Sequence, residues 1–497
     1  MFKNFPGYKI LEGIQKKKSH KRERKFPLNA IKLIFIVAIT LVIAMLPTES
    51  FGIEGLTVVH QRIISLFVFA ALMWLTETMP SWVTSMVVVT VMLFTVSTSA
   101  FSFLRPEGGV GLVPFKSIFA CFSNPTIMLF IGGFVLAIGL TKVKLDVALA
   151  RVLLKPFGTR SEIVLLGFIL VTAIFSAFVS NTATAAMMLA FLTPVLRSLP
   201  ADGKGRIALA LAIPVGANLG GMITPIGTPP NMIALDYLSS QGMGISFVDW
   251  TIKMAPFVIV LLVLAWILLR FMFPFKQKNI KIEIEGEIKW NYKTWSVVVA
   301  FALTIFMWMF GTDLWGIDTN VVAMIPVAIF CATGILTRRD LEEINWSVLW
   351  MVAGGFALGV ALNYSDANSA SLSSLIVKSV PFDNFSPLVV MILAGLICFG
   401  FSNFISHSAA TSLLVPELGV VASGLGTALD GVGDPQAMLV GIAIASSVSM
   451  ILPISTPPNA IAHSTGFIEQ KDMMKVGIIV GIMGLVLGYC MLIFIGF

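Results

Sequence analysis

Residues 222–234 read MITPIGTPPNMIA, and residues 450–462 read MILPISTPPNAIA. Ten of the thirteen positions are identical, at a constant offset of 228 residues. Each Thr-Pro-Pro lies inside a long apolar stretch. Two consecutive prolines remove amide donors and favour extended backbone before them, so a helix cannot continue through either segment. The sequence therefore predicts two matching helix breaks.

The composition is that of an integral membrane protein. Of 497 residues, 57% are hydrophobic and only 12% are charged, against about 25% charged residues in a soluble globular protein. The net charge of +7 equals the excess within residues 1–27 alone. The basic balance thus describes a tail and not a nucleic-acid surface, and a soluble enzyme and a disordered chain are excluded as well.

Nine apolar stretches have roughly the 20 residues needed to cross a bilayer. They are residues 29–47, 61–79, 81–103, 118–141, 252–273, 292–311, 319–336, 346–363 and 474–496. Four further apolar stretches, near 163–196, 207–238, 386–416 and 436–465, have polar or proline-rich centres. Lys and Arg gather in the loops that share the side of the basic N-terminus. This predicts a cytoplasmic N-terminus. The lack of a recognisable transit peptide suggests a plasma (inner) membrane location.

The repeat extends upstream of the Thr-Pro-Pro breaks. The sequence FVSNTA at 178–183 matches FISHSA at 404–409, and GGF at 132–134 matches GGF at 354–356. Each polar tripeptide, 180–182 and 406–408, separates two short apolar runs and is predicted to be the tip of a re-entrant hairpin. Our span count places the two copies in opposite orientations. Inverted repeats with matching broken helices are typical of secondary transporters.

This organisation divides the chain into seven parts. They are a basic cytoplasmic tail (1–28); N-terminal scaffold spans (29–117); a first inverted repeat (118–273) with its tip at 180–182 and its break at 224–230; a cytoplasmic linker (274–291); scaffold spans of the second half (292–345); a second inverted repeat (346–473) with its tip at 406–408 and its break at 453–458; and a last span (474–497).

The tips and breaks resemble those of the divalent anion/sodium symporter (DASS) family, the INDY-like dicarboxylate carriers. The resemblance covers nearly the whole chain after residue 28. It implies an all-α fold of about eleven spans with two re-entrant hairpins, a homodimer, an elevator movement, and C4–C5 dicarboxylate substrates such as succinate, malate, fumarate and 2-oxoglutarate. The substrate-binding residues that it implies are Ser180, Asn181, Thr182, Gly227, Thr228, Ser406, His407, Ser408, Ser455 and Thr456.

One residue departs from the family pattern. Sodium-coupled relatives have Ser-Asn-Thr at both tips, whereas the second tip here is Ser406-His407-Ser408. An asparagine carbonyl can ligate sodium, but an imidazole has no oxygen and can itself become a cation. The resemblance places a first sodium site near Ser176, Asn181 and Gly227, and the substitution speaks against a second one.

The same histidine suggests a mode of transport. A positive charge fixed to an empty site would resist movement through hydrocarbon, so the carrier would return only with another anion bound. We therefore expect a sodium-independent dicarboxylate:dicarboxylate exchanger. Sodium- or proton-coupled symport of di- or tricarboxylates remains as an alternative. For His407 itself, the alternative role is a hydrogen bond to a neighbouring helix, without a part in transport.

An intramembrane protease is the rival from another class. The segments Gly431–Asp434 (G-x-G-D) and Gly244–Phe247 (G-x-S-x) resemble protease turns, but both lie in polar loops and neither has an evident catalytic partner. The four scattered cysteines indicate neither a disulfide framework nor a zinc site. We expect no catalytic residues, no metal ligands and no organic cofactor, with dicarboxylate anions and the lipid bilayer as partners.

Overall fold

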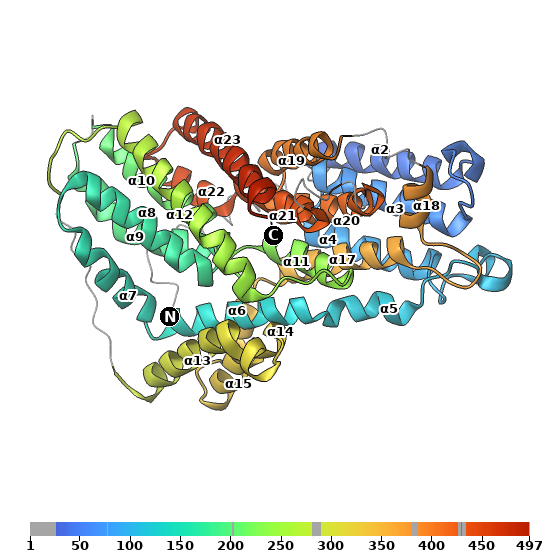
Figure 1. Cartoon of the computed structure of the whole chain (residues 1–497), viewed down its shortest axis with the longest axis horizontal. Coiled ribbons are helices and arrows are strands. Elements are labelled where there is room, and N and C mark those ends of the chain that lie inside the picture. The colour runs from blue at the N-terminus through green and yellow to red at the C-terminus, as the bar shows by residue number, and fades with distance from the viewer. Residues whose placement is uncertain are drawn as a thin grey trace.

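The structure is a computed structural model that describes residues 26–76, 78–200, 203–280, 290–379, 386–425, 429 and 434–496. Most of the predicted basic tail, residues 281–289 of the predicted linker and Gly431–Gly433 lie outside these ranges. The described residues form helices joined by loops, as Figure 1 shows.

The first half contains scaffold helices followed by a hairpin, a broken helix and a long helix. Its elements are α2 (Phe26–Met45), η2 (Thr48–Phe51), α3 (Val58–Thr76), α4 (Ser81–Thr95), η3 (Ser102–Leu104), η4 (Glu107–Gly109), α5 (Phe115–Ala120), η5 (Cys121–Ser123), α6 (Pro125–Lys142), α7 (Leu145–Leu154), η6 (Lys155–Phe157), α8 (Ser161–Phe178), α9 (Asn181–Ser198), α10 (Gly205–Gly220), α11 (Pro229–Ser240) and α12 (Phe247–Met272).

The second half repeats this order. Its elements are α13 (Tyr292–Trp315), α14 (Thr319–Val322), α15 (Met324–Ala332), α16 (Arg338–Glu342), α17 (Trp346–Asn363), α18 (Leu372–Ser379), α19 (Pro387–Phe404), α20 (His407–Leu425), α21 (Asp434–Ser447), α22 (Pro457–Ser464) and α23 (Gln470–Phe494). Helices α8 to α12 thus correspond to α19 to α23, element by element.

The two repeats contact each other reciprocally. Helix α11, which follows the first break, packs against α20 and α21, and helix α22, which follows the second break, packs against α9 and α10. Because α11 corresponds to α22, α20 to α9 and α21 to α10, each contact has a mirror contact. Paired contacts of this kind arise when a pseudo-two-fold axis relates the two repeats. Inverted repeats are expected to be related by such an axis.

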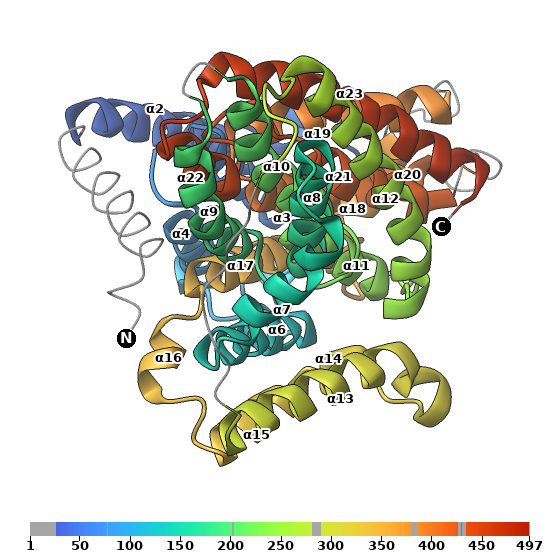
Figure 2. The same cartoon turned by 90° about the vertical axis from the view of Figure 1, so that its left-hand side faces the viewer.

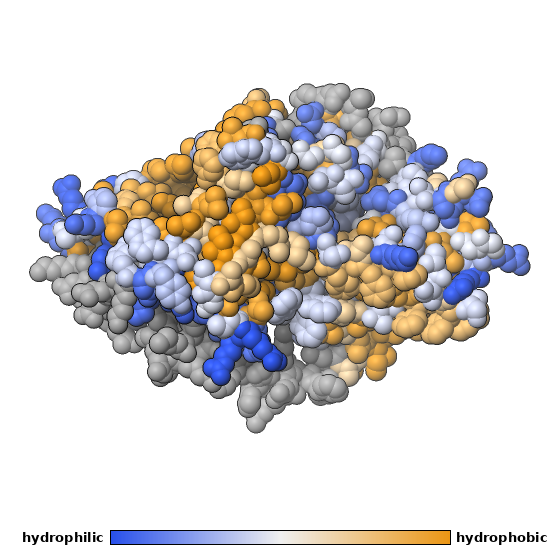
Figure 3. Space-filling model, turned by 90° about the horizontal axis from the view of Figure 1, so that it is seen from below, coloured by the Kyte–Doolittle hydropathy of each residue, from blue (hydrophilic) through white to orange (hydrophobic). Residues whose placement is uncertain are grey.

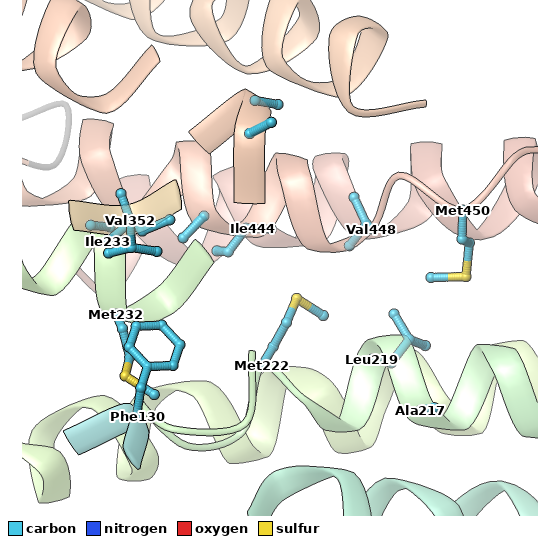
Figure 4. Close-up of a cluster of buried hydrophobic side chains, with 14 of the residues drawn as sticks. Phe130, Ala217, Leu219, Met222, Met232, Ile233, Val352, Ile444, Val448 and Met450 are labelled. Atoms are coloured by element: carbon cyan, nitrogen blue, oxygen red, sulfur yellow. The ribbon is translucent and has the colours of Figure 1, made fainter. Parts of the chain in front are cut away.

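A hydrophobic core joins the repeats next to the breaks. Leu219 near the end of α10 and Met222 just after it point toward Val448 and Met450, which follow α21 (Figure 4). Within the first repeat, α10 lies against α8 so closely that a Cβ on Gly220 would be 2.3 Å from the Cα of Ala173. The breaks therefore sit on a tightly packed frame.

Nine helices in the described ranges are long and apolar enough to cross a membrane. They include the hairpin helices α8, α19 and α20, of which α20 (19 residues) is much longer than the short apolar run predicted after the second tip. Large apolar side chains are widely exposed on the outer helices, for example Phe271 at 75% and Trp295 at 57%. Figure 3 shows broad apolar areas on one face of the molecule, as a lipid environment requires.

Three predicted spans were wrong in their limits. The span at 81–103 ends at Thr95, because residues 96–98 turn away and pair with Val113. The span at 118–141 is interrupted at Asn124, whose side chain caps α6 ahead of Pro125. The span at 319–336 is split at Ala323 and ends at Ala332.

Two further features were not predicted. The segment between the predicted apolar stretches 118–141 and 163–196 contains the ten-residue helix α7. Helices α13 and α15 pack together, and Figure 2 shows them with α14 along one side of the molecule, against α6. This group is part of the predicted second-half scaffold.

Candidate functional site

The first hairpin turns within two residues. Helix α8 ends at Phe178, Val179 is extended, and Ser180 caps α9, its Oγ accepting a hydrogen bond from the Ala183 N–H at 3.3 Å. Serine is a favoured N-cap because its hydroxyl satisfies one of the free amides of the first turn. Asn181 is therefore the first residue of α9, at the tip of the hairpin.

Oxygen atoms cluster around Asn181. The Ser176 Oγ lies 2.6 Å from the Asn181 Oδ1 and 2.7 Å from the Ala217 carbonyl oxygen. A hydroxyl has a single hydrogen and can donate to only one of these two acceptors. The asparagine side chain also lies directly on Gly221, where a Cβ would be 2.7 Å from Oδ1. The first tip is thus rich in acceptors and depends on a glycine beside it.

The first break is held open by one asparagine. Between Gly220 and Pro229 the chain is not helical, and the Asn231 Nδ2 donates to the carbonyl oxygens of Gly221 (3.0 Å) and Thr224 (2.8 Å). Thr228 is extended and precedes α11, but its side chain makes no capping hydrogen bond. At the break, backbone carbonyl oxygens lose their partners within the helix, and the Asn231 side chain donates hydrogen bonds to two of them.

The second hairpin has the same backbone course with a different side chain at its tip. The Ser406 Oγ accepts from the Ala409 N–H at 3.2 Å, and His407 begins α20. The His407 Nε2 lies 2.6 Å from the Ser449 carbonyl oxygen. A carbonyl only accepts, so Nε2 carries the proton and donates. Ser449 occupies the repeat position of Gly221.

The second break matches the first, with one additional cap. Asn459 Nδ2 donates to the carbonyl oxygens of Met450 (2.8 Å) and Leu452 (3.1 Å). Thr456 is extended, and its Oγ1 accepts from the Asn459 N–H at 3.2 Å. Both breaks therefore end in Thr-Pro-Pro-Asn, but only at the second does the threonine hydroxyl cap the following helix.

A cavity of about 330 Å³ lies between these elements. All ten residues that the sequence singled out line it. The cavity is also lined by the first residue of each of four helices, α9, α11, α20 and α22, so four helix N-termini meet there. A helix N-terminus carries a partial positive charge, which favours anions. Helices α9 and α20 also present free N–H groups there, whereas the Pro-Pro starts of α11 and α22 have none in their first two residues. The described lining includes no Asp, Glu, Lys or Arg, and His407 is its one ionisable side chain.

Sequence reasoning missed part of this lining. Asn218 on α10, Asn345 and Ser347 near the start of α17, and an apolar wall complete the cavity. The wall includes Met79, Trp82, Phe130, Phe134, Val348 and Met351. Phe134 belongs to the repeated Gly-Gly-Phe, which is the one signal that pointed to this wall.

The donor types limit which metals the described site can hold. Within the described residues, no three His, Cys, Asp or Glu side chains come together as metal ligands. The first tip, with its hydroxyl, amide and backbone oxygens, has the ligand chemistry of a hard monovalent cation. The second tip places an N–H where such a cation would need an oxygen, so its donor set does not fit one.

A family model described as a citrate transporter (CitMHS) matches residues 71–441, about three quarters of the chain. The chain belongs to this transporter family. An uncharacterized transporter of Haemophilus influenzae is 30% identical over 470 residues, covering 90% of this chain and 94% of that protein. A sodium-dependent dicarboxylate transporter, SdcS, of Staphylococcus saprophyticus is 28% identical over 460 residues, covering 85% and 84%. These matches confirm the resemblance to the DASS carriers.

The fold is also found in a solved structure. The YdaH transporter of Alcanivorax borkumensis, described as having an unusual topology, superimposes with a TM-score of 0.54 at 14% identity, over 86% of this chain and 97% of that one. The citrate transporter family is a family of membrane carriers and not of enzymes. In agreement, Ser246 of the G-x-S-x segment caps α12, its Oγ accepting from the Asp249 N–H at 3.0 Å.

Proposed function

We propose that this protein exchanges C4–C5 dicarboxylates, such as succinate, malate, fumarate and 2-oxoglutarate, across the plasma membrane without sodium. The observation that carries the proposal is the cavity between two pseudo-two-fold-related hairpin tips, with four helix N-termini directed at it. Two matching sets of donors suit two carboxylates of one substrate. One set is Ser180, Asn181, Thr182, Gly227 and Thr228, and the other is Ser406, His407, Ser408, Ser455 and Thr456.

His407 supports exchange over sodium symport. A dianion entering a protein interior needs compensating positive charge. Because Nε2 already holds a proton against Ser449, a further proton on Nδ1 would make the ring a cation and supply that charge. The charge would then belong to the protein and not leave with the substrate. An empty, charged site would move across the membrane slowly, and a bound counter-substrate would restore neutrality.

A sodium-coupled symporter is the second candidate, and the first tip favours it. Ser176, Asn181 and Ala217 place three oxygens together with one hydrogen among them. A sodium ion near Ser176, Asn181 and Gly227 would satisfy these oxygens and offset substrate charge. The name of the staphylococcal relative agrees with this candidate. Proton-coupled symport through His407 is the remaining form of coupling.

The proposal includes an elevator movement of the two repeats against the scaffold, a cytoplasmic N-terminus and a homodimer, as the DASS resemblance implies. Light scattering of the detergent-purified protein tests the dimer. A cysteine reporter placed on the exposed side of α13, assayed in intact cells, tests the orientation.

Uptake of radiolabelled succinate into proteoliposomes tests the function. Vesicles are prepared with and without internal succinate, and external sodium is replaced by potassium or choline. We expect uptake only into loaded vesicles, at equal rates in the three cations. Uptake into empty vesicles driven by a sodium gradient would overturn exchange and establish the sodium-coupled candidate. No uptake of any dicarboxylate under any condition would overturn both.

A further inference from the structure

A single side chain of the first repeat reaches the second break. Asn218, on α10, is 2% exposed and lines the cavity. Its Nδ2 donates to the Thr456 Oγ1 at 3.2 Å and to the Asn459 Oδ1 at 3.1 Å. Both acceptors belong to the other repeat, so this amide links the two halves inside the binding region.

The orientation of the Asn218 amide follows from its neighbour. The two hydrogens of the Asn459 Nδ2 are directed to the carbonyl oxygens of Met450 and Leu452, so Asn459 presents its oxygen to Asn218. A flipped Asn218 would set two amide oxygens against each other. Only Nδ2 of Asn218 can therefore face Asn459 and Thr456.

This contact determines what the Thr456 hydroxyl can do. A hydroxyl has two acceptor positions and one hydrogen. At Thr456 the acceptor positions are filled by the Asn459 N–H and the Asn218 Nδ2. Among the described residues the Thr456 hydroxyl has no acceptor for its own hydrogen, and Thr456 lines the cavity. The hydroxyl is thus left as a donor to whatever occupies the cavity.

The first break has no such arrangement. The Thr228 hydroxyl makes no capping hydrogen bond, so the direction of its hydrogen is not fixed by a cap as it is at Thr456. The repeat position of Asn218 in the second half is Ser446, whose shorter side chain donates to the His407 carbonyl oxygen at 3.0 Å. Consequently the Asn231 Oδ1, which corresponds to the Asn459 Oδ1, is buried with no hydrogen-bond partner among the described residues.

We propose that Asn218 is a positioning residue that fixes the Thr456 hydroxyl as a hydrogen-bond donor to one carboxylate of the substrate. Thr228, at the other break, contributes a hydroxyl that is not fixed in advance. The two ends of a symmetric dicarboxylate are therefore bound by unequal threonines. This inference rests on the proposed function and deepens it, because it assigns different duties to two residues with the same motif position.

A double-mutant cycle tests the proposal. The variants are N218A, T456V and N218A/T456V, with T228V and N218A/T228V as the matched control set. The KM for succinate and the maximal rate of exchange are measured for each in proteoliposomes. We expect N218A to raise KM about threefold to tenfold with less than a twofold change in maximal rate, since it weakens one hydrogen bond to a charged group. T456V should raise KM at least as much, and the N218A/T456V double variant should match T456V alone.

The control set separates positioning from a general structural role. Because the hydrogen bonds of Asn218 among the described residues go to Thr456 and Asn459 and not to Thr228, the effects of N218A and T228V should multiply. If the effects of N218A and T456V multiply as well, or if N218A lowers only the maximal rate, Asn218 does not act through Thr456 and the proposal is overturned. Should N218A not yield monodisperse protein, N218S replaces it, since serine occupies the corresponding position 446.

Failure of the proposed function gives different results. If the unmodified protein takes up no dicarboxylate, both proposals fall, and if its uptake is driven by sodium, only exchange falls and the same cycle is measured on that uptake. If the unmodified protein exchanges succinate while the cycle shows no coupling, only the role of Asn218 is wrong. T456S provides a positive check, because it keeps the hydroxyl and should preserve both a near-normal KM and the dependence on Asn218.

Discussion

The two hairpin tips have the same backbone course and are closed by opposite chemistry. At the first, the Asn181 oxygen meets the Ser176 hydroxyl and the side chain lies on Gly221. At the second, the His407 N–H reaches the carbonyl of Ser449, which stands at the repeat position of Gly221. The first tip therefore presents hydrogen-bond acceptors to its surroundings. At the second tip, the His407 N–H is already donated to the Ser449 carbonyl oxygen.

This difference shows how a duplicated fold can serve two duties. The breaks, caps and hairpins supply the same set of helix N-termini from both sides, which suits two carboxylates. The side chains at the tips then decide what else each side binds. A cation suits the first tip, whereas the second carries its own hydrogen and, with a further proton, its own charge.

Substitution of Gly221 should have the largest effect. In G221A the new methyl would stand 2.7 Å from the Asn181 Oδ1, so the asparagine must leave its place at the tip. Loss of its hydrogen bonds to a charged substrate should lower the affinity for succinate by about tenfold to a hundredfold. Binding is measured by the shift in thermal stability on titration with succinate, which also reports on folding.

The mirror position supplies the comparison. Ser449 already has a Cβ, so S449A should lose only a buried hydroxyl and bind succinate within about threefold of the unmodified protein. G359A, at a helical glycine whose added Cβ meets nothing within 4 Å, controls for the change of residue type. Equal losses in G221A and S449A would show that the tips do not differ in the way described.

Substitution of His407 should change the coupling more than the affinity. H407N removes the N–H that satisfies Ser449 and introduces an amide, as at Asn181. We expect uptake into vesicles without internal substrate, driven several-fold above background by an inward sodium gradient. The measurement is succinate uptake with sodium or choline outside.

H463N is the matched control for that variant, because His463 lies on α22 and is not part of the cavity lining. It should leave exchange unchanged. Sodium-independent exchange at the normal rate in H407N would mean that His407 sets neither the charge nor the coupling of the carrier.

Much of this site was predictable because the signal was local and duplicated. Two Thr-Pro-Pro breaks and two polar tripeptides recur in the same order, and all ten residues chosen from them line one cavity. Asn218 was not predictable in this way. It lies within an apolar helix, its repeat position holds Ser446, and its partners are more than two hundred residues away.

The ends of several helices were predicted wrongly for a related reason. Hydropathy alone does not reveal a side-chain cap such as Asn124, which begins α6, or a turn such as Ser97–Thr98, which follows the end of α4, inside apolar sequence. The apolar wall of the cavity was also hidden, since Trp82 and Met351 resemble any other lipid-facing or core residue until the fold brings them together.

The ion pair between Lys142, at the end of α6, and Asp340, in the short helix α16, gives a smaller effect that depends on pH. The Lys142 Nζ lies 2.5 Å from the Asp340 Oδ2, which joins the end of α6 in the first half to α16 in the second. Burial alone would raise the pKa of Asp340, but hydrogen bonds from Lys142 and Thr337 outweigh it and hold the pKa below its usual value. D340N should therefore destabilise the protein by about 1.5–3 kcal/mol at neutral pH.

The sign of the pH effect follows from that lowered pKa. The stabilisation is complete above the ordinary carboxyl pKa of about 3.9 and is lost as the pH falls through the lower folded value. The Tm of D340N should thus lie below that of the unmodified protein from pH 6 to 8, with the gap closing below about pH 4. D249N, which changes an exposed carboxyl at the start of α12, is the control. A gap that stays constant with pH would show that the ion pair is not its source.

The smallest expected effect is a difference in stability between variants of the two break asparagines, Asn231 and Asn459. Each donates to two carbonyls, but only the Asn459 oxygen has a partner, Asn218, while the Asn231 oxygen is buried without one among the described residues. Removing Asn459 loses the additional hydrogen bond from Asn218 and a long one to the Ser455 Oγ (3.5 Å), and removing Asn231 also relieves an unsatisfied group. N459A should therefore be less stable than N231A by about 0.5–1.5 kcal/mol, measured as apparent Tm in detergent.

In an N218A background this difference should shrink toward zero, because Asn459 then loses its extra partner. If the difference persists there, the two breaks differ for a reason other than the link that Asn218 makes between the repeats.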